Sequence, residues 1–312
     1  MDTVLYLVVP CYNEQEVLPE TSKRLKAKLD SLIGAEKISD NSRILFVDDG
    51  SKDATWSIIN SLTESDEHFG GVKLSRNRGH QNALLAGLFT AKDLCDIAIS
   101  LDADLQDDID AIDGMVAEYY NGCDIVYGVR NKRETDTFFK RATAEGFYKV
   151  MQALGVDIVF NHADYRLMTK RALEGLFEFG ERNLFLRGMI PQIGYKTAEV
   201  SYARHERFAG ESKYPLKKMI YFAFDGITSF SVKPIRIIAA LGGFIVFASV
   251  LAFIISLIMG VSSLGMTALA CSLWLLGGIQ LLALGIVGEY VGKIYQETKH
   301  RPRFIIEKTV IK

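Results

Sequence analysis

The sequence predicts an α/β protein in which a doubly wound, mostly parallel sheet is followed by a membrane anchor. Two observations support this fold class. The first 130 residues alternate short apolar runs with segments of helical periodicity, which is typical of βαβ units. Further along, the 52 residues between Arg236 and Glu289 contain no Asp, Glu, Lys or Arg, although such residues make up 24% of the chain. We therefore expect a soluble domain and a separate apolar segment.

Five short apolar runs predict buried parallel strands, because their apolar residues are continuous rather than alternating. They lie at residues 5–9, 44–47, 72–74, 97–101 and 125–127. The segments between them predict helices at 17–33, 54–64, 81–92 and 109–120. Ligands of such sheets bind beyond the carboxyl ends of the strands. The residues that follow each strand are therefore the candidate site.

The charge-free run is long enough for two spanning helices and a short turn, since one span needs about 20 apolar residues. We expect the spans at about 235–258 and 267–291. Lysine and arginine flank the pair on both sides and are missing from the turn, which predicts that both flanks face the cytoplasm. The alternative is a buried helical hairpin, but core helices rarely run this long without a polar face.

The stretch 214–230, ahead of the first span, mixes apolar residues with Lys217, Lys218 and Asp225. This pattern predicts an amphipathic helix on the membrane surface, which would hold the site at the level of lipid headgroups. The same helix could instead, or in addition, pack on its own domain.

Composition and motifs exclude several classes of protein. The 36 Lys and Arg residues balance 38 Asp and Glu, so no basic field argues for nucleic acid as a partner. The chain has neither GxxxxGK[ST] nor GxGxxG, which disfavours a P-loop NTPase or a dinucleotide enzyme. The four cysteines form no CxxC pair, which argues against structural zinc and a disulfide framework.

Carboxylates and amides follow four of the predicted strands. The segments are 10–14 (PCYNE), 48–53 (DDGSKD), 76–80 (RNRGH) and 102–106 (DADLQ). Carboxylates gathered at one rim repel one another unless a cation or a donor-rich ligand lies among them. Such hard oxygen ligands suit Mg²⁺ or Mn²⁺, with substrate phosphates in the remaining positions. The rim therefore predicts a nucleotide whose diphosphate is bridged by a divalent cation.

Position separates two Asp-x-Asp pairs. Asp102 and Asp104 end a buried strand, where a ligand-binding role is expected, whereas Asp108 and Asp110 begin a helix, where acids favour the helix dipole.

The Asp48-Asp49-Gly50 segment has a simple explanation as a turn, with Ser51 or Asp53 capping the next helix. In register with the other rims, Asp48 or Asp49 is also expected to accept hydrogen bonds from a base or ribose.

Taken in order, these motifs resemble the inverting glycosyltransferases of family 2, which have the GT-A fold. The resemblance rests on residues 9–14, 47–53 and 102–106. Residues 163–168 (ADYRLM), 207–213 (RFAGESK) and 225–231 (DGITSFS) are similar to one branch, the polyprenyl-phosphate glycosyltransferases. That branch includes dolichol-phosphate mannose synthase and bacterial undecaprenyl-phosphate glucosyltransferases. The two spans and the 295–302 tail resemble the bacterial members.

The resemblance implies transfer of a sugar, with UDP-glucose as the expected donor, to undecaprenyl phosphate at the cytoplasmic face of the inner membrane. The cofactor would be Mg²⁺ or Mn²⁺. The expected domains are a GT-A domain at 1–210, an amphipathic interfacial segment at 211–234, a two-helix hairpin at 235–292 and a cytoplasmic tail at 293–312. The expected partners are a nucleotide sugar, a polyprenyl phosphate lipid and the membrane, with no nucleic acid, and a homo-oligomer is left open.

The family's roles carry over residue by residue. The acceptor phosphate would be bound by Arg130, Arg133 and Arg141. The metal would be bound by Asp102, Asp104 and Gln106. The nucleotide sugar would be bound by Pro10, Tyr12, Asn13, Glu14, Asp48, Asp49, Ser51, Asn77, Asp102, Ala103, Arg207 and Lys213.

The chain departs from archaeal mannose-synthase-like members at Glu145, where they place a serine four positions past the residue matching Arg141. Arg133 and Lys140 either compensate for this departure or are solvated surface charges.

A lipid phosphate acceptor also fits the chemistry. Its second pKa is near 6, so at neutral pH it is largely a dianion and hardly needs a general base. The catalytic residues would be Arg130, Arg141 and Asp164, with both arginines binding the phosphate in bidentate fashion. Asp164 is the base that the family offers, but we expect it to orient Arg166 or the sugar, or to stabilise charge. The alternative is that Asp164 is only a buried partner of Arg166.

Three other functions are open to this sequence. A processive polysaccharide synthase shares the GT-A core but carries a QxxRW motif, and no Arg-Trp occurs here. A transferase that uses GDP-mannose or UDP-N-acetylglucosamine differs only in a few pocket side chains. A non-catalytic nucleotide-sugar sensor would not need Asp102, Asp104, Gln106 and Arg130 together.

Overall fold

The structure is a computed structural model that describes residues 2–130, 162–182, 185–203, 234–238, 240–242, 244–245, 247, 251 and 266–312. The chain divides into two units. The first comprises Met1–Ala144, Ile158–Tyr214 and Arg301–Lys312, and the second comprises Glu145–Asp157 and Pro215–His300. Every strand of the described residues belongs to the first unit.

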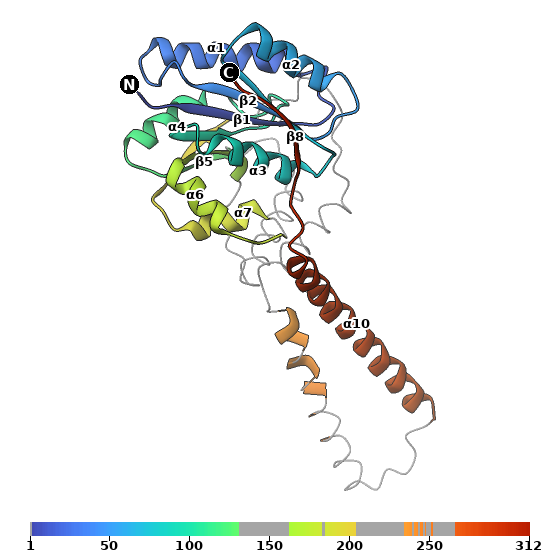
Figure 1. Ribbon diagram of the computed structural model, residues 1–312. Coiled ribbons are helices and arrows are strands. Elements are labelled where there is room, and N and C mark those ends of the chain that lie inside the picture. The colour runs from blue at the N-terminus through green and yellow to red at the C-terminus, as the bar shows by residue number, and fades with distance from the viewer. Residues whose placement is uncertain are drawn as a thin grey trace. The chain divides into compact units, whose positions relative to one another are not determined.

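Among the described residues, an eight-stranded sheet forms the centre of the first unit, in the order β7-β5-β6-β4-β1-β2-β3-β8. Figure 1 labels β1, β2, β5 and β8 of this sheet. The strands are β1 (Leu5–Cys11), β2 (Arg43–Asp48), β3 (Phe69–Leu74), β4 (Ile97–Ser100), β5 (Ile125–Arg130), β6 (His162–Thr169), β7 (Thr197–Tyr202) and β8 (Ile306–Val310). β1 pairs in parallel with β2 and β4, and β2 pairs in parallel with β3. The five strands expected from the apolar runs are confirmed, as is the α/β fold with a mostly parallel sheet.

Three strands were not predicted. β6 is antiparallel to both β4 and β5 and lies between them, and β8 is antiparallel to β3 at one edge. β7 pairs in parallel with β5 at the other edge. Their sequences, HADYRLMT, IEKTV and TAEVSY, contain no continuous apolar run. Two of them are edge strands, and the third has Asp164 and Arg166 among its apolar residues.

Helices cover both faces of the sheet (Figure 1). They are α1 (Leu18–Gly34), α2 (Thr55–Ser65), α3 (His80–Ala91), α4 (Ala111–Tyr120), α6 (Lys170–Glu178) and α7 (Leu186–Met189), which continues into a 3₁₀ turn at Ile190–Ile193. Apolar residues of α1, α2 and α4 pack with one face of the central strands in a single core cluster. The four helices expected between the first five strands are confirmed, each within two residues at either end.

Helix α3 lies on the opposite face and approaches the sheet closely at Gly87. A Cβ atom at this position would lie 2.4 Å from Val8 Cγ1 and 2.6 Å from Val47 Cγ2, so only glycine allows the observed packing. The first residue of α3 is His80, which follows the loop after β3.

The second unit contains α10 (Met266–Thr298), which covers the second predicted span and continues beyond it. Large apolar side chains are exposed along this helix, namely Leu269, Leu273, Leu276, Leu281, Leu282, Leu284, Val287, Val291 and Ile294. By hydropathy and length, no helix within the described residues qualifies as a membrane span. The two-span hairpin stays a prediction, and most of the 211–234 segment lies outside the described ranges.

Candidate functional site

The loops that follow β1 and β2 are joined to each other by hydrogen bonds. The backbone N–H of Asn13 donates to Ser51 Oγ at 3.0 Å, and the N–H of Lys52 donates to Asn13 Oδ1 at 2.9 Å. Asn13 adopts a left-handed conformation with φ of 54°, which asparagine tolerates better than most residues. The N–H of Glu14 donates to Thr55 Oγ1 at 2.9 Å. The structure therefore brings the predicted residues of 10–14 and 48–53 together, with Pro10 opposite Val47 in the sheet.

Asp48 and Asp49 are buried carboxylates that shape these loops. Asp48 Oδ1 accepts from the N–H of Ser51 at 3.0 Å, and Asp49 accepts from the N–H groups of Arg78 at 2.7 Å and Gly79 at 2.9 Å. Burial raises the pKa of both carboxyls. Their contact with a base or ribose stays a prediction.

Gly50, in the loop after β2, allows the backbone of Asn77 to lie against that loop. Its φ is 66°, and a Cβ atom there would lie 2.6 Å from the backbone N of Asn77. The loops after β2 and β3 therefore touch, and the sequence-predicted Asn77 lies next to the Asp48–Asp49 turn.

The loop after β4 carries the residues predicted to bind a metal. Asp104 is buried, and its Oδ1 accepts from the N–H of Gln106 at 3.1 Å, while the carbonyl of Ala103 accepts from Thr21 Oγ1 at 2.7 Å. Desolvation raises the pKa of Asp102 to about 6, and the charges of neighbouring carboxyls act in the same direction, whereas His80 opposes them. The hydrogen bonds of Asp104 with Gln106 and of Ala103 with Thr21 thus fix the conformation of the loop after β4.

The donor set of this loop suits a hard divalent cation, because it offers two carboxylates and one amide oxygen. Within the described ranges, no three His, Cys, Asp or Glu side chains gather closely enough to hold a metal ion by themselves. Mg²⁺ commonly binds through one or two carboxylates and takes further ligands from substrate phosphates. Asp102, Asp104 and Gln106 are therefore compatible with such an ion.

Asp164 lies on β6, next to the loop that follows β4. β6 pairs with β4 so that Arg166 lies opposite Ser100, and continuing this register places Asp164 opposite Asp102. The hydroxyl of Ser100 donates to the carbonyl of Asp164 at 2.6 Å. Two elements far apart in the sequence therefore place two predicted site residues side by side.

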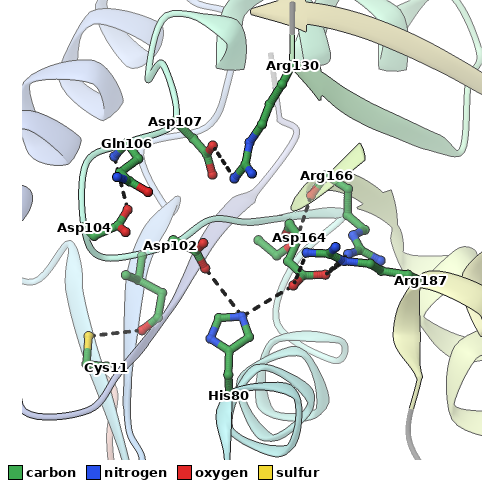
Figure 2. A network of polar contacts seen from close by, with 12 residues as sticks. Cys11, His80, Asp102, Asp104, Gln106, Asp107, Arg130, Asp164, Arg166 and Arg187 are labelled. Atoms are coloured by element: carbon green, nitrogen blue, oxygen red, sulfur yellow. Dashed lines mark hydrogen bonds and ion pairs between the residues drawn. The ribbon is translucent and has the colours of Figure 1, made fainter. Parts of the chain in front are cut away.

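Two arginines hold the Asp164 carboxylate (Figure 2). Arg187 donates from Nε to Oδ1 at 3.3 Å and from Nη2 to Oδ2 at 3.2 Å, and Arg166 donates from Nη2 to Oδ1. Arg166 is 1% exposed, whereas Arg187 is 42% exposed. Although desolvation opposes it, the positive charges of Arg187 and Arg166 hold the pKa of Asp164 far below its usual value. Asp164 and Arg166 are thus in contact, as orienting Arg166 or merely pairing with it would require, and the role of Asp164 stays a prediction.

His80 lies between Asp102 and Asp164 (Figure 2). Its Nε2 is 3.4 Å from Asp102 Oδ1 and 3.7 Å from Asp164 Oδ2. The sequence places His80 at the rim after β3, but only the fold shows which carboxylates it faces.

Arg130, at the end of β5, belongs to a second cluster at the same rim. Its Nη2 donates to Asp107 Oδ1 at 3.1 Å, and its Nε donates to the hydroxyl of Tyr202 at 3.2 Å. The Tyr202 hydroxyl also donates to Asp107 Oδ1 at 2.5 Å. Because Asp107 directly follows Gln106, this cluster connects the predicted metal-binding loop to the arginine predicted to grip the acceptor.

Sequence reasoning did not assign roles to His80, Asp107, Arg187 or Tyr202. Asp107 could have been found, since it adjoins the DADLQ segment, whereas no local pattern marks Arg187 or Tyr202. Four predicted site residues lie outside the described residues, namely Arg133, Arg141, Arg207 and Lys213, and their roles stay predictions.

Comparison with known proteins gives the following matches. The family described as "Glycosyl transferase family 2" matches residues 6–177. The glycosyltransferase YkoT of Bacillus subtilis (strain 168), described as uncharacterized, is 54% identical over 97% of this chain and 91% of its own length. The bactoprenol glucosyl transferase of Shigella phage SfV is 40% identical, covering 96% and 97%. A prophage bactoprenol glucosyl transferase homolog of Escherichia coli (strain K12) is 41% identical, covering 97% and 98%.

Among solved structures, glucosyl-3-phosphoglycerate synthase from Mycobacterium tuberculosis matches with a TM-score of 0.45 and 15% identity, covering 72% of this chain and 76% of that one. A likeness at this level supports no inference about function.

Proposed function

The chain belongs to glycosyl transferase family 2 and is a nucleotide-sugar glycosyltransferase, and we propose that it transfers glucose from UDP-glucose to undecaprenyl phosphate with inversion of the anomeric carbon. The donor sugar and the lipid are supported by relatives named bactoprenol glucosyl transferase, which are about 40% identical over nearly the whole chain. Bactoprenol is undecaprenol, and its phosphate is the form that would accept a sugar.

The observation that carries this proposal is the state of Asp164. An alcohol acceptor needs a base with a pKa near the working pH to remove its proton. Asp164 is the family's candidate for that base, yet Arg166 and Arg187 hold it as a carboxylate with a strongly lowered pKa. A lipid phosphate is already largely a dianion at neutral pH, so it needs no strong base. The locked carboxylate therefore favours a phosphate acceptor.

The main task of such a site is to bring two anions together. The side chain of Arg130 lies at the rim and is 26% exposed, and its guanidinium group is fixed by Asp107 and Tyr202. This guanidinium group can contact the acceptor phosphate. Asp102, Asp104 and Gln106 would hold Mg²⁺ or Mn²⁺, which when bound supplies positive charge to the departing diphosphate. Arg187 adds positive charge beside Asp164, with its side chain partly exposed.

The chain would act at the cytoplasmic face of the inner membrane, with both termini in the cytoplasm. The charge-free run and the exposed apolar residues of α10 support a membrane anchor. A further argument comes from β8, which follows α10 in sequence but pairs with β3 in the same sheet as the N-terminal strands. A folded sheet lies on one side of a bilayer, so a membrane anchor between β7 and β8 would cross it an even number of times, which supports placing both termini on the same side.

The test is transfer of radiolabelled sugar by the full chain, purified in detergent, to undecaprenyl phosphate, with the product extracted into organic solvent. UDP-glucose, GDP-mannose and UDP-N-acetylglucosamine are compared in parallel, each with Mg²⁺ and with Mn²⁺. We expect UDP-glucose to label the lipid fraction most efficiently. Binding of nucleotide sugars without any labelled lipid would instead favour a sensor, and labelling from another donor would correct the sugar.

A further inference from the structure

His80 is positioned by the same loops that form the nucleotide-binding rim. It is the first residue of α3 and follows Gly79, whose φ of 88° turns the chain into the helix. The N–H groups of Arg78 and Gly79 donate to the two oxygens of Asp49, so a buried carboxylate at the end of β2 fixes the backbone that carries His80. The position of the imidazole is therefore built into the rim rather than left to a free loop.

The imidazole occupies the space between two carboxylates with different surroundings. Asp102 belongs to the loop that suits a metal and a diphosphate, and Asp164 is held by two arginines. His80 Nε2 lies 3.4 Å and 3.7 Å from their oxygens, at ion-pair distance, and its side chain is 40% exposed. His68 differs clearly, because it is 13% exposed and its Nδ1 lies 2.9 Å from Asp66 Oδ1. His80 is therefore accessible to a ligand at the rim.

The place of His80 indicates which part of the donor it would meet. In a nucleotide sugar, the hexose is attached directly to the diphosphate. If Asp102 lies at the diphosphate, then the next polar groups toward Asp164 lie beside the sugar ring. Hexose hydroxyls both donate and accept hydrogen bonds, and the ring nitrogens of an imidazole are hydrogen-bonding groups that can meet them. Carboxylate and guanidinium groups, here Asp164 and Arg187, complete a set suited to hydroxyl groups.

We propose that His80 contacts a hydroxyl group of the donor sugar and helps to select that sugar. The inference rests on the proposed function, because it assumes a nucleotide-sugar donor whose diphosphate lies at Asp102. Mg²⁺ and Mn²⁺ are better suited by carboxylate, carbonyl and water ligands than by imidazole, so a role for His80 in the metal shell is disfavoured. A phosphate contact is the remaining alternative, and it predicts a different binding result.

The experiment compares UDP with UDP-glucose, which differ by the sugar alone. Binding of each to the full chain in detergent is measured by calorimetry in the presence of Mn²⁺. The variants are His80→Ala and His80→Gln. His68→Ala is the matched control, because His68 directly precedes the amino end of β3, away from the rim. We expect His80→Ala to weaken UDP-glucose binding roughly three- to tenfold while UDP affinity stays within about twofold, as loss of one hydrogen bond to the sugar implies.

Two further results are expected. His80→Gln keeps a donor and an acceptor at similar reach and restores part of the lost affinity, and His68→Ala leaves the ratio of the two dissociation constants unchanged. An unchanged ratio in His80→Ala would overturn the inference. Equal weakening of UDP and UDP-glucose would also overturn it, since His80 would then act on the diphosphate or the metal. Failure of the wild-type chain to bind UDP-glucose would instead refute the proposed donor, and the inference would fall with it.

Discussion

Arg187 holds the carboxylate of Asp164 with two hydrogen bonds, from Nε to Oδ1 at 3.3 Å and from Nη2 to Oδ2 at 3.2 Å. The two residues come from different elements, α7 and β6, and Arg166 adds a third contact from within β6 itself. A carboxylate between two guanidinium groups is a strong hydrogen-bond acceptor but a weak base. This pairing determines what a change at Asp164 should do.

Asp164→Asn is expected to retain measurable turnover, because the amide keeps the shape and the acceptor phosphate needs no base. In the folded chain the pKa of Asp164 lies below the value of about 3.9 expected for an unfolded aspartate. Asp164 is therefore ionised throughout the range from pH 7 to pH 5, and it gains a proton only in more acidic solution. A fall in rate between pH 7 and 5 must then come from other groups. Two are expected to titrate there, namely the acceptor phosphate, with its second pKa near 6, and Asp102, whose pKa burial raises to about 6.

The measurement is the pH–rate profile of wild type and Asp164→Asn, with a soluble short-chain polyprenyl phosphate at saturating UDP-glucose. A thermal unfolding scan of the variant tests whether it is less stable than wild type, because Arg166 and Arg187 lose their charged partner in Asp164→Asn. Complete inactivity with normal binding of both substrates would make Asp164 an essential base, against our interpretation.

Arg130→Ala should lower kcat/KM for the lipid acceptor roughly ten- to a hundredfold, which corresponds to about 1.5–3 kcal/mol for a charge-assisted contact. Lysine should rescue little, because Arg130 uses separate nitrogen atoms for Asp107 and Tyr202 and lysine has a single one. Initial rates at varied acceptor concentration provide the test. Arg24→Ala, an exposed arginine paired with Glu20, is the matched control, and a wild-type rate for Arg130→Ala would remove the residue from the mechanism.

Asp104→Asn should abolish transfer, because it removes one charge from the loop predicted to hold the cation. Excess EDTA should have the same effect on the wild-type chain, and added Mg²⁺ or Mn²⁺ should reverse it. Asp110→Asn is the control, since Asp110 contacts Lys28 on the surface of the same region. Full activity of Asp104→Asn, or of the wild-type chain in EDTA, would contradict a metal-dependent reaction.

Gly87→Ala should destabilise the first unit, because the added Cβ would lie 2.4 Å from Val8 and 2.6 Å from Val47, both fully buried. Overpacking of this kind costs about 1–3 kcal/mol, so we expect the melting temperature to fall by several degrees. Gly34→Ala at the end of α1 is the control, because nothing lies within 4 Å of its added Cβ. Equal melting temperatures for wild type and Gly87→Ala would show that α3 can move away from the sheet without cost.

A reporter fused after Lys312 should behave as cytoplasmic, whereas one inserted near Ser263 should be exported. The first expectation follows from β8, which belongs to the same sheet as the N-terminal strands, and the second from the two predicted spans. Paired enzymatic reporters active on only one side of the membrane provide the measurement. A cytoplasmic signal from the insertion near Ser263 would rule out the hairpin.

The first five strands and the four helices between them could be predicted because each is specified locally. Continuous apolar runs predict buried strands, and helical periodicity predicts the helices that cover them. The candidate rim followed from the same reasoning, since the carboxyl ends of parallel strands meet at one edge. Asn13, Asp48, Asp49 and Asp104 could therefore be chosen before any contact was known.

The partners within the rim were decided by the tertiary structure alone. β6 enters the sheet between β4 and β5, more than 60 residues after β4, and only this antiparallel pairing brings Asp164 beside Asp102. Arg187 and Tyr202 reach the site from still later elements. Pairing between distant strands depends on the summed packing of the whole sheet, and the direction of a side chain depends on register. Local periodicity carries neither kind of information, which is why the sequence predicted the rim while the fold determined that His80, Arg187 and Asp107 complete it.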